Sequence, residues 1–323
     1  MLFAGVDLGG TNIACALGTA DGQLVVERSI ATESHLGPEA VLGRIAVLVG
    51  ELAAECGGPP AALGMGAPGL VDRERGTTLF LPNLPTQWRN VPVRDLLSAR
   101  TGCPVYLLND VRTATLGELV FGRGREARTM VFFALGTGIG GGVVVDGELR
   151  LGPLGAAGEL GHQTIVPDGP LCGCGNRGCL ETLASGPALA AEGARLVRSG
   201  LAPRLRELAG GSVDRITTRE MAIAAEDGEE SVRHAIVRGA GYLGIGIANI
   251  VTALHPELVV LGGGVAAIGP LLFDAVRDTV RQRVRMFPVE DVRIEPSALG
   301  DRAGIYGAIA LAARSFEKWT TPT

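Results

Sequence analysis

The chain has 323 residues, of which 46% are hydrophobic and 20% are charged, and its formal net charge is −5. This length indicates two domains, and the apolar fraction is too high for a disordered chain and sufficient for a large core. The sequence contains no block rich in lysine and arginine, so nucleic acid is not an expected partner.

The first residues, MLFAGVDL, contain neither the basic start nor the cleavage site of a secretory signal. No uncharged apolar run approaches the roughly 20 residues of a membrane helix. We therefore expect a cytoplasmic protein without a membrane partner. Lysine occurs once, at Lys318, far from every glycine-rich segment, which excludes a P-loop of the G-x-x-x-x-G-K-[ST] kind. A bound phosphate would have to be held by backbone N–H groups, hydroxyls, arginine or a metal ion.

Residues 2–8 predict a short strand, which leads into the glycine loop Gly9-Gly10-Thr11-Asn12 and a second strand at 13–17. Glycine lets backbone N–H groups approach an anion, and the threonine and asparagine add side-chain donors. Asp7 would repel a phosphate directly, so it fits this loop only if a divalent cation lies between them. The alternative is a β-hairpin in which the glycine pair merely turns the chain.

Apolar periodicity predicts a helix followed by two strands, at 38–56, 61–66 and 104–108. The second of these strands ends at Asn109-Asp110, just before a predicted helix at 113–121. The end of a strand before a helix is where open α/β sheets bind ligands, and a helix N-terminus favours an ionised carboxylate. Asp110 could therefore accept a hydroxyl proton during phosphoryl transfer. The alternative is that Asp110 only caps the helix.

The pattern of the N-terminal segment repeats from residue 130. A strand at 130–135 is followed by the glycine-rich loop 136–142, which begins Gly136-Thr137-Gly138, and by a strand at 143–145. Two copies of a strand–loop–strand unit indicate a duplicated α/β architecture with two phosphate-binding loops. A third glycine cluster, at 262–264, follows a strand predicted over 256–261; it fits either a flat backbone surface against a nucleotide or a plain turn.

Three of the six cysteines lie within the segment CGCGNRGC, as Cys172, Cys174 and Cys179, and His162 precedes that segment by ten residues. Three thiolates and one imidazole make a closed tetrahedral set, which is typical of structural zinc. Clustering in a chain without an export signal favours a metal over disulfides. The alternative is that these cysteines are free surface thiols.

Two glutamates flank the predicted metal loop. Glu159 precedes His162 by three residues, and Glu181 follows Cys179 by two. A rigid metal loop would hold both carboxylates in place, and carboxylates are good acceptors for adjacent sugar hydroxyls. The alternative is that both are solvated surface acids.

Four further helices are predicted in the second half of the chain, over 187–198, 229–253, 270–285 and 304–314. No low-complexity tract or long linker separates the elements, so we expect two domains joined by a tight hinge. We predict a small α/β domain formed by 1–112 and 301–323. The large α/β domain is expected over 113–300, with an inserted zinc loop at 162–179.

Taken together, these segments resemble the ROK family (repressors, open reading frames and sugar kinases), on its bacterial glucokinase side. The matching segments run in the family order over nearly the whole chain: DLGGTN at 7–12, GAPGLVD at 66–72, PNLPTQW at 82–88, LND at 108–110, LGTGIGGG at 135–142, GELGH at 158–162, CGCGNRGCLE at 172–181 and PELVVLGGGV at 256–265. The pair GELGH and CGCGNRGCLE is highly specific, whereas the glycine loops alone are not.

The resemblance implies an actin/hexokinase-like (ribonuclease H-like) duplicated fold, with two α/β domains and a cleft between them that closes over sugar and ATP. It implies that Asp110 is the general base on the 6-hydroxyl of glucose or a related hexose. The residues expected to contact the sugar are Asn83, Asn109, Asp110, Glu159, His162 and Glu181. Those expected to hold the nucleotide and its phosphates are Gly9, Gly10, Thr11, Asn12, Gly136, Thr137, Gly138, Gly263 and Gly264.

The resemblance also implies two metal ions. Asp7 would orient Mg²⁺ through water. A structural Zn²⁺ would be bound by His162, Cys172, Cys174 and Cys179. The two ring nitrogens of His162 are separate, so one could bind zinc while the other faces the sugar.

Several alternatives remain open at this level. The chain could be another kinase of the same family, acting on N-acetylmannosamine, another amino sugar or fructose. It could be a sugar-responsive regulator, although the first strand begins at residue 2 and leaves no room ahead of it for a DNA-binding helix-turn-helix. A sugar-binding protein without catalysis would not need Asp110 and two phosphate loops. Polyphosphate could replace ATP as the donor, and a homodimer or homotetramer is expected because the family commonly forms them.

Overall fold

The computed structural model describes residues 1–81 and 84–320, and the chain folds into two compact units. Unit 1 comprises Met1–Ala127, Val143–Gly158 and Ser297–Thr323, and unit 2 comprises Arg128–Gly142 and Glu159–Pro296. The predicted division assigned 113–127 and 143–158 to the large domain, whereas here they group with unit 1. The reason is that helix α3 (Asp110–Val120) packs along helix α10 (Ala303–Thr320), so the chain following Asp110 stays with the N-terminal sheet.

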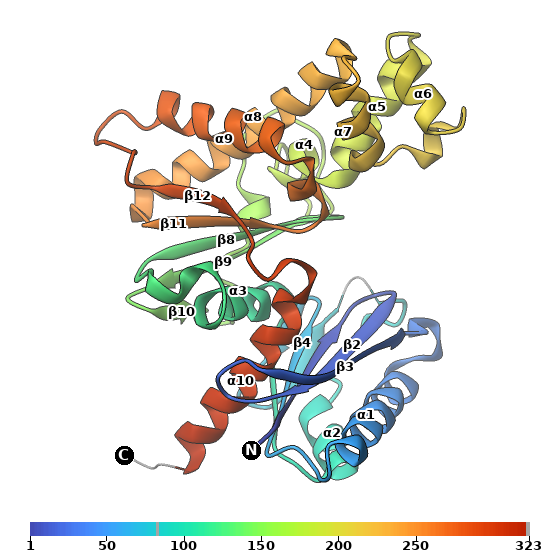
Figure 1. Cartoon of the computed structure of the whole chain (residues 1–323), viewed down its shortest axis with the longest axis vertical. Coiled ribbons are helices and arrows are strands. Elements are labelled where there is room, and N and C mark those ends of the chain that lie inside the picture. Colours follow the sequence, from blue (N-terminus) through green and yellow to red (C-terminus); the bar gives the residue numbers. More distant parts are fainter. Residues whose placement is uncertain (82–83, 321–323) are drawn as a thin grey trace. The chain divides into compact units, whose positions relative to one another are not determined.

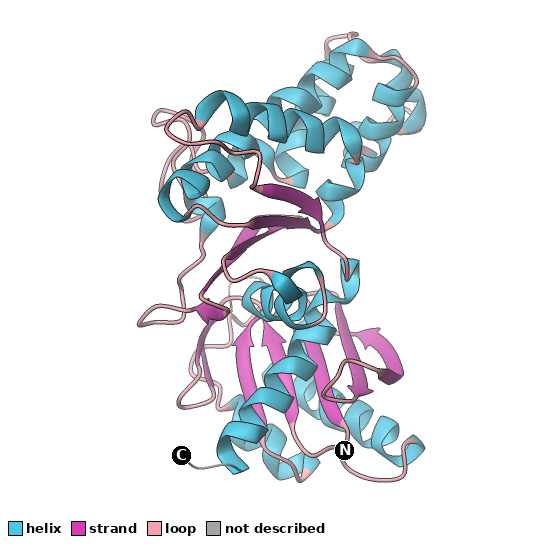
Figure 2. Cartoon of the chain, turned by 60° about the vertical axis from the view of Figure 1, so that its left-hand side comes forward, coloured by secondary structure: helices cyan, strands magenta, loops and turns pink. Residues whose placement is uncertain are grey.

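The first sheet lies in unit 1 and has the strand order β3-β2-β1-β4-β7. Its strands in chain order are β1 (Phe3–Leu8), β2 (Asn12–Gly18), β3 (Leu24–Ala31), β4 (Leu63–Ala67) and β7 (Val105–Asn109). The first three strands pair antiparallel, and β4 pairs parallel with both β1 and β7. These strands lie side by side in Figure 1 and as magenta arrows in Figure 2. A separate hairpin is formed by β5 (Leu70–Asp72) and β6 (Thr77–Phe80).

Alternate residues of β1 point to opposite faces of this sheet, and both faces are covered. The even residues pack into the core that helices α1 (Pro38–Glu55) and α2 (Val93–Thr101) complete. The odd residues face α10, where a side-chain carbon on Gly5 would lie 2.8 Å from the carbonyl oxygen of Ile305. Asp7 shares this second face by the same alternation, so its carboxylate lies beneath a helix rather than in the main apolar core.

The second sheet has the strand order β10-β9-β8-β11-β12. Its strands in chain order are β8 (Met130–Leu135), β9 (Ile139–Val145), β10 (Glu148–Arg150), β11 (Leu258–Gly262) and β12 (Arg293–Pro296). Numbered along the chain, both sheets follow the order 3-2-1-4-5, which confirms the predicted duplication. The strand β9 begins three residues after Gly136 and includes the glycines that we predicted as loop, because ladder pairing needs only the backbone N–H and C=O groups that glycine also has.

The remaining helices belong to unit 2. They are α4 (Glu181–Ala184), α5 (Gly186–Arg198), α6 (Pro203–Leu208), α7 (Thr218–Glu226), α8 (Glu230–Leu254) and α9 (Pro270–Arg283). Short 3₁₀ helices occupy Ser34–Leu36, Arg123–Glu126, Leu160–His162, Val213–Arg215, Gly264–Ile268 and Gly300–Arg302. By length and composition α8 could cross a membrane, but more than half of its apolar stretch is buried and it packs against α9. It is therefore placed as a core helix of unit 2.

Candidate active site

The carboxyl end of β7 carries the predicted base. Strand β7 ends at Asn109 and helix α3 begins at Asp110. The helix cap is Asn109, whose side-chain oxygen accepts hydrogen bonds from the backbone N–H groups of Val111 (3.0 Å) and Arg112 (3.1 Å). Asp110 is thus the first residue of the helix and not its cap. Its Oδ1 accepts a hydrogen bond from the N–H of Val111 at 2.8 Å, so the carboxylate is oriented by the helix N-terminus.

A buried arginine stabilises the junction between β7 and α3, which we call the Asp110 corner. Arg112 is 2% exposed, and its guanidinium donates to Asn109 Oδ1 and to the backbone carbonyls of Ala156 and Ala157, each at 3.1 Å. The Nδ2 atom of Asn109 donates to the carbonyl of Gly69 at 3.0 Å. Within the described part of the chain, the oxygen of Asn109 therefore receives three hydrogen bonds, and one amide hydrogen is left for a ligand. Sequence reasoning missed Arg112, since nothing in its neighbourhood distinguishes it from a surface arginine.

Asp7 ends up beside Asp110 because of the strand order. The parallel register aligns Asp7 of β1 with Gly66 of β4, and Gly66 with Leu108 of β7. Burial, and second the charge of Asp110, raise the pKa of the Asp7 carboxyl to about 6. Its Oδ2 also faces the first turn of α10, where a side-chain carbon on Gly304 would lie only 2.3 Å away. The two carboxylates lie at the carboxyl ends of β1 and β7 and repel each other. Carboxylate oxygens are the donors that Mg²⁺ prefers, so the pair fits a divalent cation.

The first glycine loop is a tight turn that is stabilised by hydrogen bonds from Thr32. The N–H of Gly9 donates to the carbonyl of Asn12 at 2.9 Å. Thr32, which is fully buried, donates its hydroxyl to the carbonyl of Gly9 and its N–H to the carbonyl of Thr11, both at 2.7 Å. Residues 10–12 at the tip are exposed and available to a ligand. Asn83, the sugar contact predicted from the PNLPTQW segment, lies outside the described residues.

The second glycine loop borders a hollow of about 290 Å³ within unit 2. The N–H of Gly136 donates to the carbonyl of Gly138, and the N–H of Gly186 donates to the carbonyl of Gly136, both at 2.9 Å. The lining residues come from four segments: Gly136, Thr137, Gly186, Pro187, Ala190, Ile216, Thr217, Thr218, Gly264 and Val265. The first turns of α5 and α7 are among them, and helix N-termini favour anions.

The glycines at 263 and 264 reach the same hollow from the end of β11. Gly263 has a φ of 84° and a side-chain carbon there would lie 2.5 Å from the carbonyl oxygen of Leu135. Only glycine fits this position, because both the conformation and the space exclude a side chain. The neighbouring Gly264 lines the hollow. Gly263 and Gly264 were predicted as nucleotide contacts, whereas Ile216 and Thr217 were not, because they lie between a short 3₁₀ helix and α7 and do not follow a strand.

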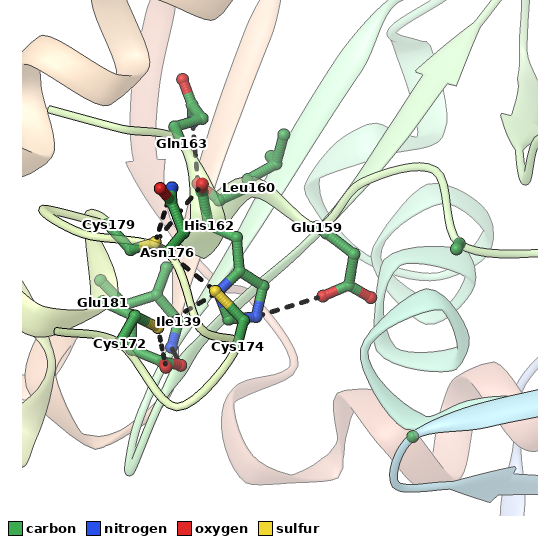
Figure 3. A network of polar contacts seen from close by, with 12 residues as sticks. Ile139, Glu159, Leu160, His162, Gln163, Cys172, Cys174, Asn176, Cys179 and Glu181 are labelled. Carbon is green, nitrogen blue, oxygen red and sulfur yellow. Dashed lines mark hydrogen bonds and ion pairs between the residues drawn. The ribbon is translucent and has the colours of Figure 1, made fainter. Parts of the chain in front are cut away.

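The predicted zinc ligands form one cluster, drawn in Figure 3. The ligand atoms of His162, Cys172, Cys174 and Cys179 all lie within 4.8 Å of one another. Cys174 Sγ is 3.8 Å from Cys179 Sγ, and His162 Nδ1 is 3.6 Å from Cys172 Sγ. With Zn–S near 2.3 Å and Zn–N near 2.0 Å, a tetrahedral site separates its ligand atoms by about 3.5–3.8 Å. The donor set and its spacing therefore fit a structural zinc ion, and all four protein ligands are supplied.

The protonation of the cluster also bears on metal binding. Burial raises the pKa of Cys172 and of Cys179, whereas the backbone N–H of Asn176 lowers the pKa of Cys174. Zinc binds thiolates, so loading the site must release protons from the buried thiols. On the other side of the imidazole, His162 Nε2 lies 3.8 Å from Glu159 Oε2. The ring thus turns one nitrogen to the cysteines and the other to a predicted sugar ligand.

The two flanking acids differ in their surroundings. The Glu159 side chain is 44% exposed. Glu181, the first residue of α4, is half-buried, and its Oε2 accepts a hydrogen bond from the N–H of Ile139 at 3.0 Å. Its Oε1 accepts a weaker hydrogen bond from Cys172 Sγ at 3.7 Å. Glu181 is therefore not a solvated surface acid, because it links the cysteine cluster to the second glycine loop.

Comparison with known proteins gives consistent results. The ROK family model matches residues 3–315. A glucokinase of Thermotoga maritima is 37% identical over 310 residues, covering 95% of this chain and 96% of that protein. A xylose repressor of Caldicellulosiruptor bescii is 34% identical over 310 residues, covering 95% of this chain and 77% of the repressor. The crystal structure of a ROK family glucokinase from Streptomyces griseus in complex with glucose and AMPPNP superposes with a TM-score of 0.84 at 34% identity, over 97% of this chain and 100% of that one. The predicted actin/hexokinase-like α/β fold is confirmed.

Proposed function

The chain belongs to the ROK family and is glucokinase-like, and we propose that it is an ATP-dependent kinase that phosphorylates the 6-hydroxyl of glucose. The observation that carries this proposal is the pair of carboxylates, Asp7 and Asp110, at the carboxyl ends of strands of the first sheet. Asp110 is oriented by the N-terminus of α3, and burial of Asp7, together with the charge of Asp110, raises the pKa of Asp7. A protein that only binds a sugar gains nothing from two repelling acids, whereas phosphoryl transfer needs a base and an acid that attracts a cation.

In this proposal Asp110 takes the proton of the 6-hydroxyl as that oxygen bonds to the γ-phosphorus of ATP, while the bond from the γ-phosphorus to the β,γ-bridging oxygen breaks and ADP leaves. Phosphoryl transfer passes through a loose transition state, so a weak base that is well positioned is sufficient. The sugar hydroxyls would donate hydrogen bonds to the carboxylates of Glu159 and Glu181. The second ring nitrogen of His162 carries a hydrogen when the first binds zinc, so it would donate to a sugar oxygen. Asn109 has one amide hydrogen left, so it would donate to a sugar oxygen and could not accept from a hydroxyl.

The nucleotide would be bound by the two glycine loops. The exposed tip 10–12 and the N–H groups around Thr137 would hold the phosphates, while the hollow lined by Ile216 and Gly264 would take the adenosine. Magnesium, when bound near Asp7, would neutralise charge on the phosphates. The cysteine cluster would have a purely structural role, because its four protein ligands leave no open position for substrate or water.

The sugar specificity is tested by initial rates with ATP on glucose, mannose, N-acetylmannosamine, N-acetylglucosamine and fructose, with ADP release as the readout. We expect the largest kcat/KM for glucose. A larger kcat/KM for N-acetylmannosamine would replace the proposed substrate while leaving the kinase chemistry in place. Substituting polyphosphate for ATP in the same assay tests the donor, for which we expect ATP.

The similarity to xylose repressors favours one second function, a sugar-responsive regulator. A regulator would bind the sugar without turnover. Calorimetry with glucose, run beside the rate assay, separates the two functions: binding with no ADP release above background would support the regulator. For the kinase we expect a cytoplasmic location, where ATP is available, and a homodimer or homotetramer.

A further inference from the structure

The peptide backbone at Ile139 is held from both sides by the segments around the cysteine cluster. Its N–H donates to Glu181 Oε2 at 3.0 Å. Its carbonyl oxygen lies against Gly161, where a side-chain carbon would be only 1.9 Å away. Ile139 is the first residue of β9 and directly follows the loop Gly136-Thr137-Gly138. The end of the second phosphate loop is therefore in contact with Gly161 of the GELGH segment and with Glu181 of the CGCGNRGCLE segment.

The approach of the loop to Glu181 is as close as glycine permits. A side-chain carbon on Gly138 would lie 2.3 Å from Glu181 Oε2. The other end of the loop is fixed separately, since the N–H of Gly186 donates to the carbonyl of Gly136. Thr137 lies between these two attachments and lines the hollow. Loss of the attachment at Glu181 would remove the side-chain hydrogen bond that fixes the end of this loop next to Thr137 and its neighbouring N–H groups.

The two oxygens of Glu181 have different partners. While Oε2 accepts from the backbone of Ile139, Oε1 accepts from the thiol of Cys172. The bond of Oε1 to the thiol is long, at 3.7 Å, whereas the bond of Oε2 to the backbone N–H is 3.0 Å. Oε1 is therefore the oxygen that a hydroxyl of the sugar can take, while Oε2 keeps its bond to the loop.

From this arrangement we propose that Glu181 anchors the nucleotide-binding loop in addition to contacting the sugar, with one carboxylate oxygen for each task. The proposal rests on the proposed kinase function and deepens it. It makes Glu181 a positioning residue for the phosphate donor. Nucleotide affinity then depends on Glu181 even when no sugar is present, which a residue that only contacts the sugar would not cause.

Glu159, the other glutamate predicted to bind the sugar, provides a matched control. Figure 3 shows Glu159 beside the imidazole of His162, on the side away from Ile139 and Glu181. Both glutamates are expected to accept sugar hydroxyls, and Glu181 in addition accepts a hydrogen bond from the N–H of Ile139. Glu159→Ala should therefore weaken glucose binding without changing the affinity of the sugar-free chain for nucleotide.

The test is calorimetric titration of Mg²⁺·AMPPNP into the full-length, zinc-loaded chain without sugar. A hydrogen bond to a charged acceptor justifies an expected loss of about tenfold or more in nucleotide affinity for Glu181→Ala. Glu181→Gln keeps an acceptor for the Ile139 N–H, so we expect its nucleotide affinity within about threefold of wild type. Glucose titrations of the same variants should show weaker binding for all three, and zinc content with circular dichroism checks that each variant is folded.

The outcomes separate this inference from the kinase proposal. If Glu181→Ala binds AMPPNP as tightly as wild type and loses only glucose, the anchoring role is wrong and the kinase proposal stands. If wild type itself binds no nucleotide, both are wrong. Should Glu181→Ala fail to fold, Glu181→Met, which keeps the length of the side chain but has no carboxylate to accept from Ile139, takes its place. Nucleotide affinity equal to that of wild type in this variant would overturn the proposal.

Discussion

The corner around Asp110 in unit 1 and the cysteine cluster in unit 2 hold their functional side chains by different means. In the first, fully buried Arg112 and the cap residue Asn109 are fixed by hydrogen bonds to other parts of the protein. In the second, the segment between Cys172 and Cys179 is mostly exposed and contains no large apolar residue. A loop of this composition buries little apolar surface, so a bound zinc ion would stabilise it. In the proposed assignment, one region is organised by the chain alone and the other by the chain together with an ion.

The first way to sharpen this comparison is to remove the base without disturbing its surroundings. Asp110→Asn preserves size and the capping network but removes the proton acceptor. We expect kcat to fall about 10³-fold while the glucose dissociation constant changes less than about threefold, measured by ADP release and calorimetry. Asp95→Asn, which changes an exposed aspartate in the first turn of α2, should behave as wild type. A variant at 110 that kept more than about a tenth of the rate would contradict the assigned role.

The second prediction breaks the metal-dependent region. Cys174→Ser, or treatment with a strong chelator, should lose the zinc ion and weaken glucose binding at least about tenfold, because Glu181 and His162 lose their fixed positions. Zinc content and glucose calorimetry measure both effects. Cys56→Ser, at the end of α1 in unit 1, should retain zinc and affinity. A zinc-free protein with full glucose affinity would show that the loop orders itself.

The third prediction addresses the buried arginine. Arg112→Met leaves the carbonyls of Ala156 and Ala157 without their donor, so we expect the free energy of unfolding to fall by about 3 kcal/mol, with a lower kcat. Urea unfolding measures the loss. The control is Arg28→Met. Arg28 pairs with Glu51 and Glu55 at the surface, so its replacement should lower the free energy of unfolding much less than that of Arg112. Equal losses in the two variants would refute the special role of burial at 112.

The last prediction concerns the pH dependence of stability. The folded-state pKa of Asp7 is raised from 3.8 to about 6, so the folded state binds a proton that the unfolded state has released between these values. Stability therefore falls as pH rises through this window, and the charged carboxylate costs at most about 3 kcal/mol at pH 7. Asp7→Asn should be more stable than wild type at pH 7.5 and nearly equal at pH 4, in urea unfolding without nucleotide. The same stability difference at both pH values would exclude this explanation.

The strands that flank the glycine loops and the long helices could be predicted, because their apolar periodicity is local and unambiguous. The strands β5, β6, β10 and β12 were missed, since three or four residues are too few to establish a period. Helix α7 was also missed, although its capping box at Thr217 and Glu220 is a recognisable start signal. Asn109 was predicted as a sugar ligand, and its use as the helix cap became visible only in the structure.

The sequence by itself determined the candidate chemistry: which residues could be base, phosphate loop and metal ligands, since each motif is a short run whose spacing is fixed by the covalent chain. Tertiary structure alone decided which motifs act on one another. Glu181 reaches Ile139 across 42 residues. Glu118, fully buried in α3, accepts hydrogen bonds from Ser297 and Leu299 across about 180 residues. Such pairs form only when sheets and helices bring distant segments together, and no local sequence pattern encodes contacts over such separations.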